Sequence, residues 1–150
     1  MMSQRSGSEF VNFVTVPLLR AAAAHAVRCF PMECCGYITA VGVVECTNAQ
    51  ASGVHPTVPE RGAETGFVIA GAELLAFARS FDGPAPARVV YHSHTNGRAY
   101  FSGVDQDVAR GAGYPVHHLV IGVDDAGPTE AALFDGEFVE IARWPREVLR

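Results

Sequence analysis

The stretch RVVYHSHTNGRAYFSGVDQDVARGAGYPVHHLVIGVDD, residues 88–125, predicts three consecutive elements of a covered β-sheet. Residues 88–94 carry apolar side chains on both faces of an extended chain, which is typical of a central strand with other elements on each side. Residues 102–113 follow as a short helix, and residues 115–125 follow as a second buried strand. This alternation of strand, helix and strand favours an α/β or α+β fold.

The flanking sequence continues the alternation in both directions. Upstream, we expect a strand over 10–16, a helix from Pro17 to Phe30, a hairpin over 35–48, a loop over 47–63, a strand over 64–70 and a helix over 71–81. Downstream, residues 129–144 predict a hairpin that turns at Asp135 and Gly136. The chain is therefore predicted to form a mixed β-sheet flanked by helices, in a single domain over residues 9–150 after a flexible N-terminus of residues 1–8.

Composition and charge argue against several classes of protein. Of the 150 residues, 49% are hydrophobic and 18% are charged, which is the balance of a compact chain rather than a disordered one. The formal net charge of −5 and the lack of a Lys/Arg run give no basic surface for nucleic acid. No apolar run is long enough to cross a membrane, and the polar N-terminus does not resemble a signal peptide. We therefore expect no membrane partner and a cytoplasmic location.

The four cysteines do not follow the spacing of a zinc knuckle. Cys29, Cys34, Cys35 and Cys46 include no CxxC pair, and the adjacent Cys34 and Cys35 cannot easily form a disulfide with each other. We expect them to be reduced and mostly buried, as free cysteines usually are.

Three residues around the end of the 88–94 strand suggest a metal centre. His92 and His94 are two residues apart on a strand, so both side chains lie on one face and can lean toward one point. Asp105, in the first turn of the following helix, can bring a carboxylate to the same point. Such a His/His/Asp set suits zinc and leaves one coordination position open, as catalytic zinc sites require.

Each of these residues also has an ordinary structural interpretation. His92 and His94 could be sheet histidines without a ligand. Ser102 and Asp105 form an S-x-x-D pattern, which resembles a capping box at a helix start. The two interpretations are compatible in part, although an Asp105 carboxylate that binds zinc is expected to be less free to cap the helix.

Glu33 is a candidate general base. It lies in PMECCGY, residues 31–37, between a helix end and a strand that is otherwise without charge. A nearby metal would keep its carboxylate ionised and ready to accept a proton. The alternative is that Glu33 is a solvated acid in a turn.

The remaining polar candidates are expected to be structural or solvent-facing. His25 falls in a predicted helix, His55 in a loop, and the pair 117–118 at the start of a strand. Arg98 and Tyr100 border the proposed site in the loop after His94, and they are candidates for substrate contact.

Together these residues resemble the JAMM (MPN+, Mov34/PAD-1) metallopeptidase family. The sequence has a P-x-E-x-C-G segment around Glu33, and then His92-x-His94, seven residues, Ser102, two residues and Asp105. The order of the flanking helices and strands is also similar to that family over most of the chain. Thr95 departs from the pattern, because the family usually has proline there, and this substitution could loosen the loop after the ligands.

The resemblance implies a fold, a cofactor and a role for each residue. It implies an MPN fold, which is related to the cytidine deaminase architecture, with Zn²⁺ held by His92, His94 and Asp105. Glu33 would be the general base and acid, and Ser102 would stabilise the oxyanion. Short prokaryotic relatives suggest hydrolysis of a peptide or isopeptide bond at the C-terminal glycine of a ubiquitin-like or sulfur-carrier protein.

Two other functions remain open at this point. The first is a scaffold of the same fold that binds partners without catalysis, although the five intact site residues argue against it. The second is a deaminase, but its H-x-E and P-C-x-x-C ligand motifs are missing. The identity of the substrate and the oligomeric state cannot be read from the sequence.

Overall fold

A six-stranded mixed β-sheet forms the centre of the structure, a computed structural model that describes residues 13–49 and 69–150. The strands are β1 (Cys35–Ile38), β2 (Val43–Cys46), β3 (Val89–His94), β4 (His117–Asp124), β5 (Gly127–Phe134) and β6 (Glu140–Pro145). The helices are α2 (Val16–Cys29), α3 (Gly71–Ser80), α4 (Gly103–Ala112) and α5 (Arg146–Leu149). The spatial order of the strands is β2-β1-β3-β4-β5-β6, so the predicted mixed sheet flanked by helices is confirmed.

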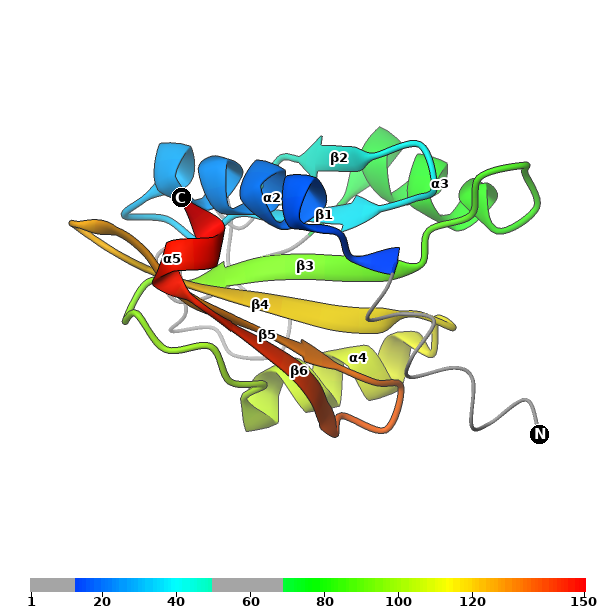
Figure 1. The fold of residues 1–150 in the computed structure, drawn as a ribbon. Helices are drawn as coiled ribbons and strands as arrows, with labels where there is room; N and C mark the ends of the chain where they lie inside the picture. The colour runs from blue at the N-terminus through cyan, green and yellow to red at the C-terminus, as the bar shows by residue number, and fades with distance from the viewer. Residues whose placement is uncertain (1–12, 50–68) are drawn as a thin grey trace.

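Strand β3 is central, as its sequence predicts. It pairs with β1 in antiparallel orientation and with β4 in parallel orientation, and every other strand pair is antiparallel. The parallel pair needs a crossover connection, which α4 provides. In Figure 1, α4 lies on one side of β3 to β6, and α2 and α5 lie on the other.

The two sides of β3 have different chemistry because successive side chains alternate between faces. Val89 and Tyr91 are fully buried in the main core cluster with α2 and α5. Val90, His92 and His94 point to the opposite face, where Phe101 and residues of α3 and α4 lie. The β3 face toward α2 therefore contributes to the core, and the opposite face presents the imidazoles.

Helix α2 forms where the alanine-rich sequence predicts it. Thr15 is the extended N-cap residue, Pro17 occupies the first turn, and Leu19 and the alanines facing the sheet are buried. The strand predicted over 10–16 is wrong for the described residues of that range. Phe13 is helical and Val16 already belongs to α2, because the prolyl ring that favours the first helical turn begins the helix there.

Both predicted hairpins are present, and one helix was not predicted. β1 pairs with β2, and β5 pairs with β6 around a turn in which the Asp135 carboxylate accepts hydrogen bonds from the backbone of Glu137 and Val139. The short helix α5 follows β6 without a capping signal in the sequence. The predicted strand over 64–70 and the loop over 47–63, with His55, lie largely outside the described residues, as does the predicted flexible terminus of residues 1–8.

All four cysteines lie in the described part of the chain, and all are free thiols, with Cys34, Cys35 and Cys46 buried. Burial raises the pKa of the Cys34 and Cys46 thiols to about 12, so these cysteines are protonated core residues. Within the described residues, no helix combines the length and the apolar character that spanning a bilayer requires.

Candidate metal centre

His92, His94 and Asp105 converge at one point, as the sequence predicts. The carboxyl end of β3 supplies both imidazoles, and the first turn of α4 supplies the carboxylate. The Nε2 atoms of His92 and His94 are 3.2 Å apart, and they lie 3.2 Å and 3.0 Å from Asp105 Oδ2. All three side chains are buried. The two histidines therefore contact each other and one carboxylate, an arrangement that favours a shared cation over two independent sheet histidines.

The three ligand atoms fit a tetrahedral metal ion. They form a nearly equilateral triangle with edges of 3.0–3.2 Å. Bonds of about 2.0–2.1 Å to zinc in tetrahedral geometry place neighbouring ligand atoms about 3.3 Å apart. Two imidazole nitrogens and one carboxylate oxygen are a donor set that zinc accepts, and the fourth vertex is not supplied by these three residues.

The hydrogen bond at His94 Nδ1 also favours a positive charge at this point. His94 Nδ1 lies 3.2 Å from the backbone oxygen of Arg98, which can only accept, so Nδ1 carries a hydrogen. In the neutral tautomer, His94 Nε2 then presents a lone pair to the Asp105 carboxylate, which is itself an acceptor. A cation or a shared proton must lie among these atoms for the contact to be favourable.

Asp105 is ionised in this environment. Burial alone raises the pKa of its carboxyl group, but the contacts with His92 and His94 outweigh burial and hold that pKa well below its ordinary value. A negatively charged ligand is therefore ready to accept a cation.

Ser102 and Asp105 also form the capping box of α4. The Ser102 hydroxyl accepts a hydrogen bond from the Asp105 backbone N–H at 3.0 Å, and Asp105 Oδ2 accepts one from the Ser102 backbone N–H at 3.0 Å. Asp105 Oδ2 therefore faces the imidazoles and closes the cap at the same time, so both interpretations of Asp105 hold in this structure. The carboxylate has enough lone pairs for both roles.

Glu33 lies two residues before β1, the strand that pairs with β3. Cys35 is the partner of His92 in the register, and the bonds between Cys34 and Ser93 extend that register by one residue. If this register continued by one more residue, Glu33 would face His94 on the same side of the sheet. Glu33 is only 3% exposed, so it is not a solvated acid in a turn, and it does not belong to the three-residue ligand group.

Two hydrogen bonds around Glu33 could not be predicted from the sequence. The Asn48 side chain donates to the Glu33 backbone oxygen at 2.9 Å. The Ser93 hydroxyl, between the two histidines, accepts from the Cys34 backbone N–H at 2.8 Å. Both contacts join segments that are distant in the chain, so only the folded structure reveals them.

The other polar candidates are placed as follows. The His25 side chain forms a buried 2.7 Å hydrogen bond with the Tyr91 hydroxyl on the opposite face, which is a structural role. The Tyr100 ring lies 4.6 Å from the His94 ring and is partly exposed, so it borders the site. The Arg98 backbone, rather than its side chain, contacts His94.

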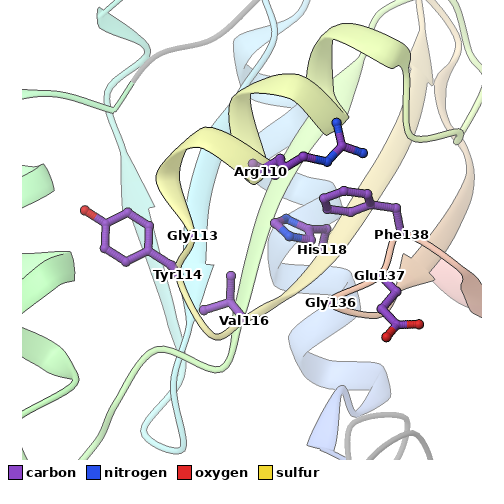
Figure 2. Close-up of a pocket in the computed structure, with 9 residues that line it drawn as sticks. Arg110, Gly113, Tyr114, Val116, His118, Gly136, Glu137 and Phe138 are labelled. Atoms are coloured by element: carbon purple, nitrogen blue, oxygen red, sulfur yellow. The ribbon is translucent and has the colours of Figure 1, made fainter.

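A separate cavity of about 450 Å³ lies at the other end of α4. Figure 2 shows its lining from the end of α4, the start of β4 and the β5–β6 turn. The His118 imidazole lines it, and burial lowers the pKa of this group to about 4, so the ring is neutral at pH 7. None of the five predicted site residues lines this cavity.

Comparison with known proteins places this arrangement in a family. A family described as prokaryotic homologs of the JAB domain matches residues 15–135, a range that includes Glu33, both histidines, Ser102 and Asp105. The chain belongs to this prokaryotic JAB family. Its membership confirms the resemblance that the sequence motif predicts.

One solved structure supports the fold of this JAB-family protein, and two others show a weaker likeness. A solution structure from Desulfitobacterium hafniense is 21% identical, with a TM-score of 0.52, over 83% of this chain and 85% of the other. A JAB1/MPN domain protein from Archaeoglobus fulgidus is 13% identical, with a TM-score of 0.44, over 83% and 90% of the two chains. A protein from Salinibacter ruber is 21% identical, with a TM-score of 0.43, over 80% and 76%. The search of curated proteins gave no significant match.

Proposed function

We propose that this protein is a zinc-dependent peptidase or isopeptidase. The observation that carries the proposal is the buried triangle of His92 Nε2, His94 Nε2 and Asp105 Oδ2. The two further polar groups of the motif are Ser102, which is hydrogen-bonded to Asp105, and the buried Glu33. This set combines metal ligands, an acid for proton transfer and a hydroxyl donor, which are the groups that metal-assisted hydrolysis needs.

Each residue has a defined task in the proposed reaction. A zinc ion bound by His92, His94 and Asp105 would supply Lewis acidity and an acidified water. The Glu33 carboxylate accepts the proton of the attacking water and then gives it to the leaving amine. Such acid–base catalysis typically contributes about 10² to 10⁴ in rate.

Ser102 stabilises the negative charge that develops on the carbonyl oxygen. Its hydroxyl oxygen already accepts from the Asp105 N–H, which fixes the side chain and leaves the O–H as a donor. Tyr100 lies at the exposed edge of the site, beside His94, where it can contact substrate.

The proposed substrate is the C-terminal tail of a ubiquitin-like or sulfur-carrier protein. A tail of this kind is extended and flexible, and its terminal glycines carry no side chains that could hinder access to a buried group. It could also pair with a sheet edge, because β2 and β6 are the outer strands of the described sheet. Family membership makes this substrate class the first to test.

The direct test uses sulfur-carrier fusions that are extended beyond a terminal Gly-Gly. The zinc-loaded protein is expected to cleave them, and a chelator is expected to stop cleavage. Glu33→Gln keeps the shape of the buried side chain but removes its base, so cleavage should fall by at least about 100-fold. Glu137→Gln, at an exposed acid in the β5–β6 turn, is the matched control and should cleave at the parent rate.

The results separate this proposal from a non-catalytic scaffold. If the protein contained zinc but cleaved none of the fusions, the metal site would be supported and the proposed peptidase activity would not. A protein that neither retains zinc nor cleaves would contradict the proposal and favour the scaffold. Cleavage by Glu33→Gln at the parent rate would remove Glu33 from the mechanism.

A further inference from the structure

The loop after His94 is held by two strands on the far side of β4. Thr129 Oγ1 on β5 donates to the Gly97 oxygen at 2.6 Å. The Glu130 carboxylate accepts from the Ala99 N–H at 2.8 Å, and Arg143 on β6 donates to the Ala99 oxygen at 2.9 Å. This loop leads from the two histidine ligands to Ser102.

The sheet register explains why the loop passes there. His94 is the partner of Gly122 on β4, and Gly122 is the partner of Glu130 on β5, so these residues form one row on one face. His94 and Glu130 are two strands apart, about 10 Å, which is too far for direct contact. Gly122 has no side chain, and a Cβ there would lie 2.7 Å from the Gly97 oxygen. The gap above Gly122 therefore admits the loop backbone between His94 and Glu130.

One peptide group spans that gap and contacts both residues. The Arg98 oxygen and the Ala99 N–H belong to the same peptide unit. The oxygen accepts from His94 Nδ1 at 3.2 Å, and the N–H donates to Glu130 Oε2 at 2.8 Å. Hydrogen bonds in such a chain polarise one another, so a carboxylate on the N–H makes the carbonyl a stronger acceptor.

We propose that Glu130 is a positioning residue of the metal centre, and that its carboxylate, oriented by Arg143, acts on His94 through the Arg98–Ala99 peptide group. The ion pair between Arg143 Nη1 and Glu130 Oε1, at 2.9 Å, directs the other carboxylate oxygen to the peptide. The relay fixes His94 with its Nδ1 protonated and its Nε2 directed to the metal position. Carboxylates that contact a ligand histidine directly have this function in many zinc sites.

The inference deepens the proposed function, because it assigns an outer support to the same zinc ligands. Its alternative is that Glu130 only anchors the loop. Glu130→Gln distinguishes the two, since the glutamine oxygen can still accept from Ala99 but carries no charge. Thr129→Val is the matched control, because it removes a neighbouring anchor of the same loop that does not contact the Arg98–Ala99 peptide.

The first experiment measures zinc affinity of the metal-free protein by competition with a chromophoric chelator. Glu130→Gln is expected to bind zinc at least about tenfold more weakly, and Thr129→Val within about twofold of the parent. Arg143→Gln keeps the Glu130 carboxylate but removes the side chain that orients it, so its loss of zinc affinity should be smaller. Parent-like affinity in Glu130→Gln and Arg143→Gln, or an equal loss in Thr129→Val, would overturn the relay.

A second experiment tests the relay without metal or activity. In protein labelled with ¹⁵N-histidine, the His94 Nδ1–H resonance should move in Glu130→Gln and stay unchanged in Thr129→Val. If the parent bound no zinc, the proposed function would fail. The resonance would still show whether Glu130 acts on His94 through the peptide group. An unchanged resonance in Glu130→Gln would end the inference.

Discussion

Asp105 shows how one side chain combines structural and chemical roles. Its Oδ2 lies within 3.2 Å of both ligand nitrogens and also accepts from the Ser102 N–H, while its own N–H donates to the Ser102 hydroxyl. The cap fixes the carboxylate before any ion binds, which reduces the entropic cost of forming the centre. Ser102 is therefore part of the support of a metal ligand as well as a candidate oxyanion donor.

Replacing Ser102 separates these contributions. Ser102→Ala removes the acceptor for the Asp105 N–H, so the free energy of unfolding should fall by about 1 kcal/mol. The three ligands remain, so one equivalent of zinc should still bind, while turnover of the fusion substrate falls by about 10² to 10³. Urea unfolding, metal analysis and kinetics measure the three effects. Ser102→Thr keeps the hydroxyl and is the control; a variant without zinc would contradict the separation of roles.

At the scale of elements, the loop between β3 and α4 carries the centre. The family pattern usually has proline where this chain has Thr95, so the local stiffness of a prolyl ring is missing. Thr129 and Arg143 donate hydrogen bonds to the loop, and Glu130 accepts one from it. The geometry of the ligands thus depends on packing against β4 and β5.

Gly122 allows that close approach, and an added side chain should disturb it. The Cβ of Gly122→Ala would lie 2.5 Å from Thr129 Oγ1 and 2.7 Å from the Gly97 oxygen. We expect a loss of about 1–3 kcal/mol in the free energy of unfolding, because backbone must shift, together with weaker zinc binding.

Gly111→Ala in α4 is the control for this substitution. A Cβ there meets no atom within 4 Å, and alanine favours a helix, so this variant should gain up to about 1 kcal/mol. Urea unfolding measures the change in stability of each variant, and the zinc competition assay measures its zinc affinity. If Gly122→Ala kept the stability and zinc affinity of the parent, the loop after His94 could move without affecting either.

The two faces of the sheet both bury apolar side chains, but only one of them carries the candidate metal centre. The face toward α2 and α5 is almost entirely apolar, and the other face carries the metal centre between β3 and α4. The centre joins two elements that form one site only in the folded chain. An ion that binds there stabilises the folded state without stabilising the unfolded chain equally.

Zinc should therefore raise the melting temperature of the protein. Free zinc at 100 times its Kd adds about 2.7 kcal/mol, which corresponds to roughly 5–10 °C for a domain of this size. A chelator should reverse the shift. His94→Ala removes one ligand and should lose the shift, the bound zinc and the activity together. Retention of a full equivalent of zinc by His94→Ala would disprove the ligand assignment.

Much of the fold could be predicted because local signals agree with it. Pro17 and the alanine run indicate α2, the doubly apolar run indicates the central position of β3, and Ser102 marks the start of α4. The segment before Pro17 was mistaken for a strand because its alternating apolar residues resemble one. Helix α5 was missed because its four residues carry no side-chain cap.

The sequence by itself determined the identity and spacing of the three candidate ligands, since a strand places His92 and His94 on one face and a helix start places Asp105 above them. It also determined the family, because the same spacing is a motif. Only the tertiary structure decided that Asp105 can cap and face the imidazoles with one oxygen, that Glu33 is buried, and that one peptide group contacts both Glu130 and His94. These contacts depend on strand register across residues far apart in the chain, and local sequence does not specify that register.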